Sequence, residues 1–480
     1  MASTQFNQSS VPGEGQNSLK RKREDDDDVE MGYEPTQEDI RLVVAAGDGD
    51  LEEFKSIHES GNGDICFQDP QTGMSVLMAA AGAGHAEVVR YLLDEGAPWN
   101  AVDRQYRCAG DYAAMNGHQT IVDIIMDHAV MSEMILSIVE SEDSAVIPSN
   151  LPTAEEAASL KATVEKEVSE YGSTPSRLNA AYLASRLEYT PAGDRLVDTS
   201  TQLAVMMDWE RPLMSRHAAW ICFADVDTAK RPSSLHTLNV GFGMGIVDEE
   251  IISHAPVSHT IIEAHPQLVG KPVVSYGTFV VLAFKVLEKM EATGWTQRSG
   301  VHVRRGRWQD VVPRLEREIA EGKLEPFDGV FFDTYAEDDR DLSQFHRHLP
   351  RIMSQHPCAR YSYYNGMCPD SVFFHGVACE TTRLRLERFG GFVWPNFDNV
   401  ARLLPGISSV EVFSRGMTYG LRADYHGRAH RREVLGFQCD FVPVPVKEEV
   451  GNAKTWKNLS GRYWNFDTYF LPQCTRRPTV

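Results

Sequence analysis

Two stretches of the chain repeat one order of small, polar and apolar residues. SVLMAAAGAGHAEVVRYLLDEGA and CAGDYAAMNGHQTIVDIIMDHAV align without a gap, and His85 and His118 stand 33 residues apart. Each copy predicts a first helix of small residues, a Gly-His turn and a second helix with one apolar face. The matched apolar positions are Val88, Val89, Leu92 and Leu93 in one copy and Ile121, Val122, Ile125 and Met126 in the other.

A 33-residue period with these features is typical of ankyrin repeats. The stretch AAGDGDLEEF at 45–54 is a degenerate earlier copy, so we expect repeats over 36–130. Each repeat buries its apolar face only against its neighbours, and we expect the module to make protein contacts. His85 and His118 are predicted to stabilise turns and not to bind a ligand.

Residues 175–480 alternate short β-rich runs with helical patterns. HTLNVGFGMG, HTIIEAH, GVHVRRGRW, FDGVFFDTY and ARYSYYNG are β-rich, whereas QDVVPRLEREIAEG and DLSQFHRHLPRIM are helical in pattern. Such alternation predicts a doubly wound α/β sheet. The acidic, alanine-rich segment at 131–174 has a helical pattern, and we interpret it as a linker between the two parts.

Charge and composition narrow the possible partners. The formal net charge of −21 argues against nucleic acid and favours a basic polypeptide. The eight cysteines include no Cys-x-x-Cys pair, which indicates neither a zinc site nor a redox dithiol. No stretch is long and apolar enough to span a bilayer, so we expect a cytoplasmic and nuclear protein. Residues 1–35 are predicted to be a disordered tail, in which the basic cluster at 20–23 is either a nuclear import signal or solvated charge.

Three glycines, Gly241, Gly243 and Gly245, lie between a predicted strand and a predicted helix. Glycine there permits a tight turn and lets a ligand lie against the main chain. The spacing GxGxG differs from the dinucleotide fingerprint GxGxxG. Glu263 ends the next strand, where a carboxylate can accept both ribose hydroxyls, and GRWQD at 306–310 ends the third, beside an expected adenine. These features together predict an adenosyl cofactor without a pyrophosphate, S-adenosyl-L-methionine.

Five motifs occur in one order at near-family spacing: VMMDWERPLM, GFGMGI, IIEAH, GRWQD and FDGVFFDTYAED. This set resembles the guanidinoacetate methyltransferase-like methyltransferases. With ankyrin repeats in front, the chain resembles the fungal type IV protein arginine N-methyltransferases from about residue 37 to its end. The resemblance implies a seven-stranded class I methyltransferase fold. It also implies methylation of the internal (δ) guanidino nitrogen of arginine in a protein substrate, such as a large-subunit ribosomal protein.

The resemblance also implies a set of cofactor-binding residues. This set is Tyr182, Met206, Gly241, Phe242, Gly243, Met244, Gly245, Ile246, Glu263, Ala264, His265, Gly306, Arg307 and Asp333. Tyr182 is preferred over Tyr189 as the aromatic residue that covers the adenosyl group. Met214 either lines the methionine end of the cofactor or belongs to the core.

Methylation of arginine needs carboxylates at the reacting group. A guanidinium is protonated and delocalised, which makes it a poor nucleophile. Carboxylates bind it in a fork, localise its charge and assist proton loss. The resemblance implies Glu210 and Asp333 for this role, with Asp333 nearer the reacting nitrogen. Glu210 could instead cap a helix, and Glu337 and Asp338 are expected to be solvated loop charges.

Two other functions stay open at this point: a small-molecule guanidino N-methyltransferase, and a non-catalytic ankyrin adaptor that only binds cofactor. The chain also departs from the family pattern at 268–285 and at about 403–430. These segments are either lineage-specific insertions or non-coding sequence that has been translated. The apolar, β-branched composition of 268–285 favours the second interpretation there, because an apolar surface loop promotes aggregation.

Overall fold

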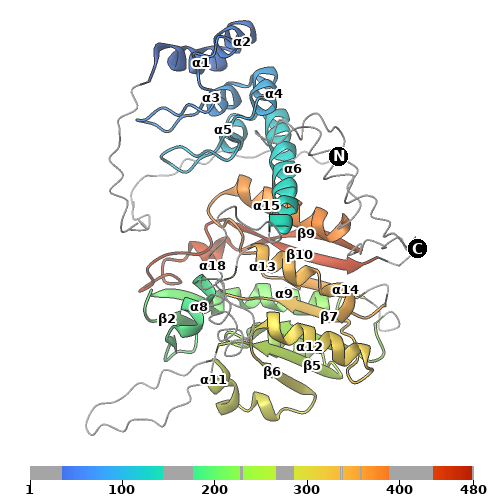
Figure 1. Ribbon diagram of the computed structural model, residues 1–480. Helices are drawn as coiled ribbons and strands as arrows, with labels where there is room; N and C mark the ends of the chain where they lie inside the picture. Colours follow the sequence, from blue (N-terminus) through green and yellow to red (C-terminus); the bar gives the residue numbers. More distant parts are fainter. Residues whose placement is uncertain are drawn as a thin grey trace, which may run out of the picture.

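The computed structural model describes residues 35–143, 177–226, 231–265, 286–335, 337, 339–356, 359–388 and 436–477. The predicted tail up to residue 34, the basic cluster within it, the linker from residue 144 onward and both atypical insertions lie outside these ranges. Within them, a stack of helices stands on an α/β part (Figure 1). No helix in the described ranges is long and apolar enough to cross a membrane.

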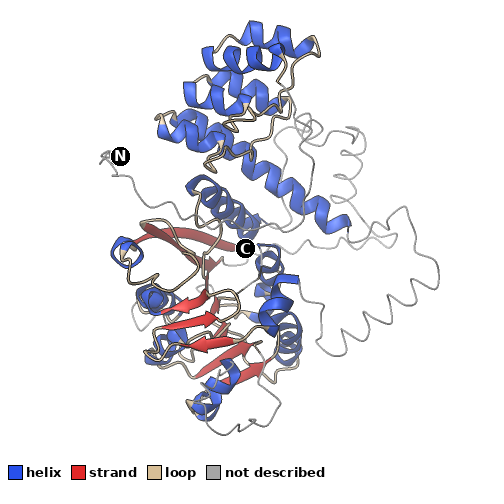
Figure 2. Cartoon of the chain, turned by 90° about the vertical axis from the view of Figure 1, so that its left-hand side faces the viewer, coloured by secondary structure: helices blue, strands red, loops and turns tan. Residues whose placement is uncertain are grey.

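The N-terminal helices form consecutive pairs that stack on one another (Figure 2). They are α1 (Gln37–Asp48), α2 (Leu51–Glu59), α3 (Val76–Ala83), α4 (Ala86–Asp94), α5 (Ala109–Met115) and α6 (Gln119–Asp143). The first helix of each pair approaches its neighbours closely because its alanines are fully or almost fully buried, as Ala46, Ala80 and Ala113 are. This close approach of small residues explains the alanine runs seen in the sequence.

Each repeat braces the turn of the one before it. Gly49 and Gly84 end α1 and α3 in the left-handed conformation, with φ of 77° and 93°. The ring of His85 covers Gly49, and a Cβ placed on Gly84 would lie 2.7 Å from the ring of His118. His85 Nε2 also lies 2.9 Å from the carbonyl oxygen of Gly47. Both histidines therefore stabilise turns, as the sequence predicted, and residues 45–54 form part of a real repeat.

The repeats are docked on the α/β part through one helix, α15 (Val372–Arg388). α6 continues past residue 130 and packs along α15. Phe373 and Val377 of α15 belong to the same apolar cluster as the repeat cores. Gly110 of α5 lies directly against the ring of Phe373, so the two parts share one buried interface.

A seven-stranded sheet with the order β6-β5-β4-β7-β8-β10-β9 organises the second part. Its strands are β4 (His236–Val240), β5 (Ser258–Glu263), β6 (Val301–Arg305), β7 (Gly329–Phe332), β8 (Arg360–Tyr363), β9 (Phe437–Pro445) and β10 (Thr468–Arg476). The first five are parallel, and β10 runs antiparallel to both β8 and β9. This arrangement confirms the predicted doubly wound sheet and the class I methyltransferase fold.

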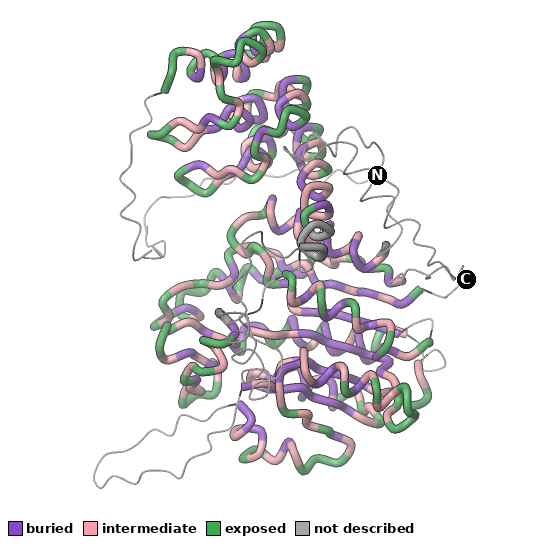
Figure 3. The backbone as a smooth tube through the Cα atoms, viewed as in Figure 1, coloured by how far each residue is buried: buried purple, intermediate pink, exposed green. Residues whose placement is uncertain are grey.

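Helices cover both sides of this sheet (Figure 2). They include α9 (Arg211–Ile221), α10 (Ile246–Ser253), α11 (Val286–Ala292), α12 (Trp308–Ala320), α13 (Asp339–His346) and α14 (Leu349–Ile352). The central strands are therefore buried (Figure 3), and β7 is buried at all four positions. The strand order reverses at β4, with β5 on one side and β7 on the other, so a crevice opens at the carboxyl ends of these strands.

A second, three-stranded sheet lies beside the crevice. It consists of β1 (Leu187–Tyr189), β2 (Arg195–Asp198) and β3 (Leu203–Met207), and it follows α8 (Arg177–Ala184). β3 leads into the short 3₁₀ helix η1 (Asp208–Glu210), which carries the WE motif. The connection between β9 and β10, which contains α18 (Lys447–Gly451), packs Trp456 and Trp464 against this region. The C-terminal segment thus completes the wall around η1.

Cys439 and Cys474 form a disulfide between β9 and β10, with their Cα atoms 4.0 Å apart. The register of the two antiparallel strands places these residues directly opposite each other. The cysteines are 35 residues apart in sequence. A search for closely spaced cysteines therefore could not find this pair, because the register of β9 and β10 brings the two cysteines together and no local motif does.

Two glycines in the repeats provide a test of the docked interface. Gly110→Ala places a methyl group against Phe373 and should destabilise the chain by about 1–2 kcal/mol, as overpacking does. Gly82→Ala is the matched control in α3, because its Cβ would stand an ordinary 3.5 Å from Tyr112. That change should be neutral, or stabilising by up to about 1 kcal/mol through helix propensity. Differential scanning calorimetry of the full chain measures both, and equal midpoints would contradict the docking.

Candidate active site

A cavity of about 760 Å³ lies at the carboxyl ends of the parallel strands. Its volume falls within the range of small-molecule sites. The cavity begins at the glycine-rich turn after β4 and extends past β8 to residues of the ankyrin repeats. Ten predicted residues line it: Tyr182, Met206, Glu210, Gly241, Gly243, Glu263, Ala264, Gly306, Arg307 and Asp333.

The other predicted residues support the cavity wall from behind. Phe242 and Ile246 are buried in the core, and Gly245 is the N-cap of α10 with φ of 76°. Met244 donates its backbone N–H to Met206 Sδ at 3.2 Å. His265 is fully buried, with its ring 5.1 Å from that of Tyr182. Met214 is fully buried in an apolar cluster, which agrees with the interpretation that it belongs to the core.

Two features explain the glycines of the glycine-rich turn. The turn faces the cavity, and neighbouring protein atoms leave no room for side chains at these positions. A Cβ on Gly241, at φ of 96°, would collide with the backbone carbonyl of Asp333. On Gly243, at φ of 54°, it would stand 2.9 Å from Met206 Sδ. Only glycine adopts such φ values without strain. The turn therefore lies directly against β7 and β3, which brings the Asp333 and Met206 side chains to the same crevice.

Glu263 presents its carboxylate to the cavity from the end of β5. Its Oε2 accepts the backbone N–H of Phe242 at 2.9 Å, and its Oε1 accepts that of His265 at 2.7 Å. Burial raises the pKa of Glu263, and these backbone donors partly oppose that shift. The backbone N–H groups of Ala264 and Gly243 also donate to this carboxylate, so the main chain holds it in a fixed position in the cavity wall.

The two candidate aromatic residues have different places. Tyr182 lines the cavity, and its ring centroid lies 5.1 Å from that of His265 and 5.0 Å from that of Tyr335. Tyr189 instead donates its hydroxyl to the carbonyl oxygen of Gly243 at 2.8 Å. Tyr189 therefore braces the glycine-rich turn, whereas Tyr182 forms part of the surface that a ligand would meet.

Glu210 ends η1 and is almost fully buried in the cavity wall. It is the N-cap residue of α9, but its side chain makes no capping hydrogen bond to that helix; the carboxylate instead accepts a backbone hydrogen bond from Met207, the residue before η1. The Tyr463 hydroxyl donates to Glu210 Oε1 and accepts the indole N–H of Trp209 at 2.9 Å. Burial, and then the negative charge of Asp333, raises the pKa of Glu210.

Asp333 follows β7 at the centre of the crevice. Its backbone N–H donates to the carbonyl oxygen of Val240 at 2.8 Å, which fixes it beside the glycine-rich turn. Its Oδ2 is buried and has no hydrogen-bond partner among the described residues. Burial raises the pKa of Asp333 to about 7, and the charge of Asp248 adds to the shift. Among the described residues, no cationic side chain lowers the pKa of either Asp333 or Glu210, and two neighbouring carboxylates in such a setting favour a cationic ligand.

The prediction that Glu337 is a solvated loop charge is wrong. Its carboxylate accepts hydrogen bonds from Trp308 Nε1 at 2.8 Å, Gln309 Nε2 at 2.9 Å and Thr334 Oγ1 at 2.6 Å. Burial raises its pKa. Glu337 therefore connects the loop after β7 to the start of α12 through hydrogen bonds. Trp308 and Gln309 lie 29 and 28 residues earlier in the sequence, so the sequence of the loop alone does not reveal them as donors. Asp338 lies outside the described residues.

Sequence reasoning missed two tyrosines of the cavity. Tyr463 reaches Glu210 across 253 positions of sequence. The Tyr364 hydroxyl, just after β8, is buried without a hydrogen-bond partner in the described structure. Burial, and then the charge of Glu210, raises the pKa of Tyr364. The available signal was the aromatic run GRYWNFDTYF at 461–470, because so many aromatic residues beside a strand indicate a buried wall.

Comparisons with known proteins agree with this architecture. The chain matches the family model of ankyrin repeats (3 copies) over residues 42–133 and that of guanidinoacetate N-methyltransferase over 184–364. Protein arginine N-methyltransferase 2 of Emericella nidulans is 30% identical over 474 residues, which cover 93% of this chain and 88% of the relative. The protein of the same name from Aspergillus fumigatus is 29% identical over 407 residues, or 73% of this chain and 87% of the relative.

A more distant relative of the same name, from Saccharomyces cerevisiae, is 27% identical over 312 residues, which cover 63% of this chain and 68% of the relative. The similarity to the Emericella nidulans protein spans both the repeats and the α/β part. The chain therefore belongs to the family of methyltransferases named protein arginine N-methyltransferase 2.

Proposed function

We propose that this protein transfers a methyl group from S-adenosyl-L-methionine to the internal (δ) guanidino nitrogen of an arginine in a protein substrate. The observation that carries the proposal is the pair of buried carboxylates, Glu210 and Asp333, in one cavity with the glycine-rich turn. The relatives are named protein arginine N-methyltransferase 2, which supports arginine as the target.

The residues around the turn suit this methyl donor. Gly241 and Gly243 offer bare backbone, Glu263 places a carboxylate in the cavity wall as the proposed acceptor for ribose hydroxyls, and Tyr182 offers an aromatic face. When bound, the donor supplies an electrophilic methyl carbon on a positively charged sulfur. The uncompensated charges of Glu210 and Asp333 also favour that positive charge nearby.

The two carboxylates would have different roles toward the guanidinium. Tyr463 holds Glu210 in one position, from which it can bind the terminal nitrogens and keep positive charge on them. Asp333 lies against the glycine-rich turn and so faces the internal nitrogen. From this position Asp333 can accept the proton that the internal nitrogen loses as the methyl group leaves the sulfur. The two carboxylates together would fix the nucleophile for in-line attack.

Two features favour a protein over a small guanidino compound as substrate. The cavity wall includes Trp99 and Glu133 of the ankyrin module, which a metabolite enzyme would not need. The net charge of −21 attracts a basic polypeptide, and a large-subunit ribosomal protein fits that chemistry. An adaptor that only binds cofactor has no use for a buried carboxylate pair. A cytoplasmic and nuclear location is part of the same proposal.

Methyl transfer is tested directly with the full chain. It is incubated with methyl-labelled cofactor and purified ribosomal proteins, and fragmentation mass spectrometry locates the label on the guanidino group. Asp333→Asn keeps the shape of the side chain but removes its charge. Turnover should fall by about a hundredfold or more, since one transition-state contact of this kind contributes ~3 kcal/mol. Turnover within about twofold of wild type would exclude this role for Asp333, because that ~3 kcal/mol effect would be missing.

Gly243→Val should weaken cofactor binding by about tenfold to a hundredfold, because strain at one such position costs ~1–3 kcal/mol. The new side chain displaces Met206 and is disfavoured at φ of 54°. Gly193→Val is the matched control: its φ is 72°, and its Cβ would meet nothing within 4 Å. The control should lose stability without losing affinity. Calorimetric titration measures both, and normal affinity in Gly243→Val would contradict the cofactor site.

Asp333 should also make the ligand-free protein less stable at high pH. Its pKa is about 7 when folded against 3.8 for the unperturbed group, so the native state holds the extra proton between these values. The free energy of unfolding therefore falls as pH rises from about 4 to 7, and it levels off above. Asp333→Asn removes this loss and should be more stable than wild type at pH 8 by about 1–3 kcal/mol. The full shift would give ~4, which partial solvent exposure reduces.

Chemical denaturation at pH 5 and pH 8 measures this difference. Asp440→Asn on β9 is the control, because Asp440 is exposed and its loss should leave the pH dependence unchanged. A stability difference between Asp333→Asn and wild type that stays constant with pH would show that Asp333 does not titrate in this range.

A further inference from the structure

The cavity is larger than the reaction at Glu210 and Asp333 requires. Beyond Tyr364 it continues along the segment 366–369 and one face of α15. Its far wall is formed by Trp99, Asn100 and Glu133, which belong to the ankyrin module. We call this region, from Gly366 to the ankyrin wall, the outer chamber. A methyl donor at the glycine-rich turn and a guanidinium at the carboxylates would leave the outer chamber empty.

The ankyrin wall of the outer chamber is held in place by packing. Trp99 and Asn100 lie on the loop between α4 and α5, and the ring of Trp99 lies 5.9 Å from that of Phe374 in α15. Glu133 lies on α6, which packs along α15. Trp99 and Glu133 are only half-buried, and Asn100 is exposed. These side chains are therefore fixed in position and accessible to a ligand in the cavity.

The outer chamber is negatively charged. Asp370, Asp339 and Glu133 surround the thiol of Cys368 closely enough that, after burial, their charges raise its pKa. Arg385 also lines the cavity, and its Nη1 lies 4.0 Å from Asp339 Oδ2. Of the described residues that line the chamber itself, Glu133 and Asp339 are acidic and Arg385 is basic, so acidic side chains outnumber basic ones there. The field in the chamber favours positively charged side chains.

One buried polar group in the chamber wall lacks a partner. Thr381 of α15 is 2% exposed and lines the cavity, and its Oγ1 has no hydrogen-bond partner among the described residues. A buried hydroxyl without a partner costs free energy. A peptide group in the chamber could satisfy it, since a hydroxyl both donates and accepts hydrogen bonds.

We infer that the outer chamber binds the polypeptide segment on either side of the target arginine, and that this segment carries further lysine or arginine residues. The inference rests on the proposed function, because the arginine side chain must pass from this segment to Glu210 and Asp333. Trp99 offers an apolar face to the segment, Glu133 a charge and Thr381 a hydrogen bond. The ankyrin repeats thus form one wall of the substrate site and set its preference for basic sequences.

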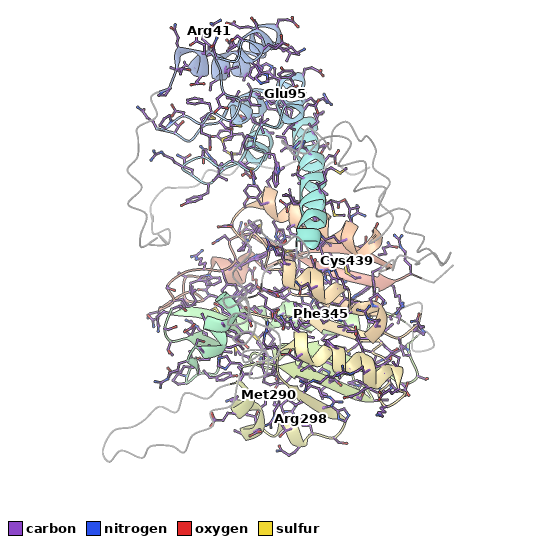
Figure 4. All side chains as sticks on the ribbon, in the orientation of Figure 1. Arg41, Glu95, Met290, Arg298, Phe345 and Cys439 are labelled. Atoms are coloured by element: carbon purple, nitrogen blue, oxygen red, sulfur yellow. A yellow bond between two sulfur atoms is a disulfide. The ribbon has the colours of Figure 1, made fainter. Side chains whose placement is uncertain are left out.

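Three substitutions in the full chain separate this role from folding. Glu133→Gln removes one charge, Trp99→Ala removes the apolar face, and Thr381→Val removes only the hydroxyl. Thr381→Val should not destabilise the protein, because the lost hydroxyl had no partner. Glu95→Gln is the matched control: it removes the same charge from the same module, on an exposed residue outside the chamber (Figure 4).

The probe is a fluorescein-labelled peptide with one central arginine flanked by lysines, and a second peptide has alanines in place of the lysines. Fluorescence anisotropy measures peptide binding in the presence of cofactor, and a separate assay measures methyl transfer. The lysine-flanked peptide should bind about tenfold more tightly than the alanine-flanked one. Each chamber variant should weaken its binding by about tenfold and raise KM accordingly, since tenfold corresponds to ~1.4 kcal/mol. Cofactor affinity and kcat at saturating peptide should stay at wild-type values.

Equal binding of the two peptides, or unchanged binding in Glu133→Gln and Thr381→Val, would overturn the inference even if the wild type methylates arginine. An equal loss in Glu95→Gln would also overturn it, because the effect would then be one of net charge. Peptide binding that depends on Glu133 and Thr381, but without methyl transfer to any arginine, would support the chamber and refute the proposed function. The experiment therefore tests the role of the outer chamber independently of the proposed methyl transfer.

Discussion

A carboxylate removed from water costs free energy unless a countercharge meets it, and the centre of this protein holds two such groups. Asp333 keeps one buried oxygen without a partner among the described residues, and Glu210 accepts hydrogen bonds from the Tyr463 hydroxyl and the backbone of Met207. The surrounding structure fixes the positions of both groups. The end of β7 and the glycine-rich turn fix Asp333, while η1 and the C-terminal segment fix Glu210. Burying these carboxylates lowers the free energy of unfolding of the ligand-free protein, and a bound cationic ligand would restore it.

The same cavity connects parts of the chain that are remote in sequence. Tyr463 comes from the connection between β9 and β10, whereas Trp99 and Glu133 come from the ankyrin repeats. The repeats are held to α15 by an apolar interface that includes Phe373 and Val377. Because the interface and the cavity share α15, the repeats occupy a fixed place beside the reaction centre.

Much of this organisation could be predicted from local patterns. The 33-residue repeat, the glycine-rich turn and the carboxylate at the end of β5 each depend on residues close together in sequence, so a pattern reveals them. The hydrogen bonds of Tyr463 and Glu337 and the pairing of Cys439 with Cys474 could not be predicted in this way. Each joins residues that only the tertiary fold brings together. The docking of the repeats on α15 was missed for the same reason, since Gly110 and Phe373 share no motif.

The central claim is that Asp333 is desolvated and lacks a countercharge until a cation binds. Carbon-13 NMR of the aspartate carboxyls measures its titration directly, with Asp333→Asn identifying the signal. The account predicts a pKa near 7 in the ligand-free protein and a clear fall when the positively charged S-adenosyl-L-methionine is added. A ligand-free pKa close to 3.8, the unperturbed value, or one near 7 that the cofactor leaves unchanged, would contradict it.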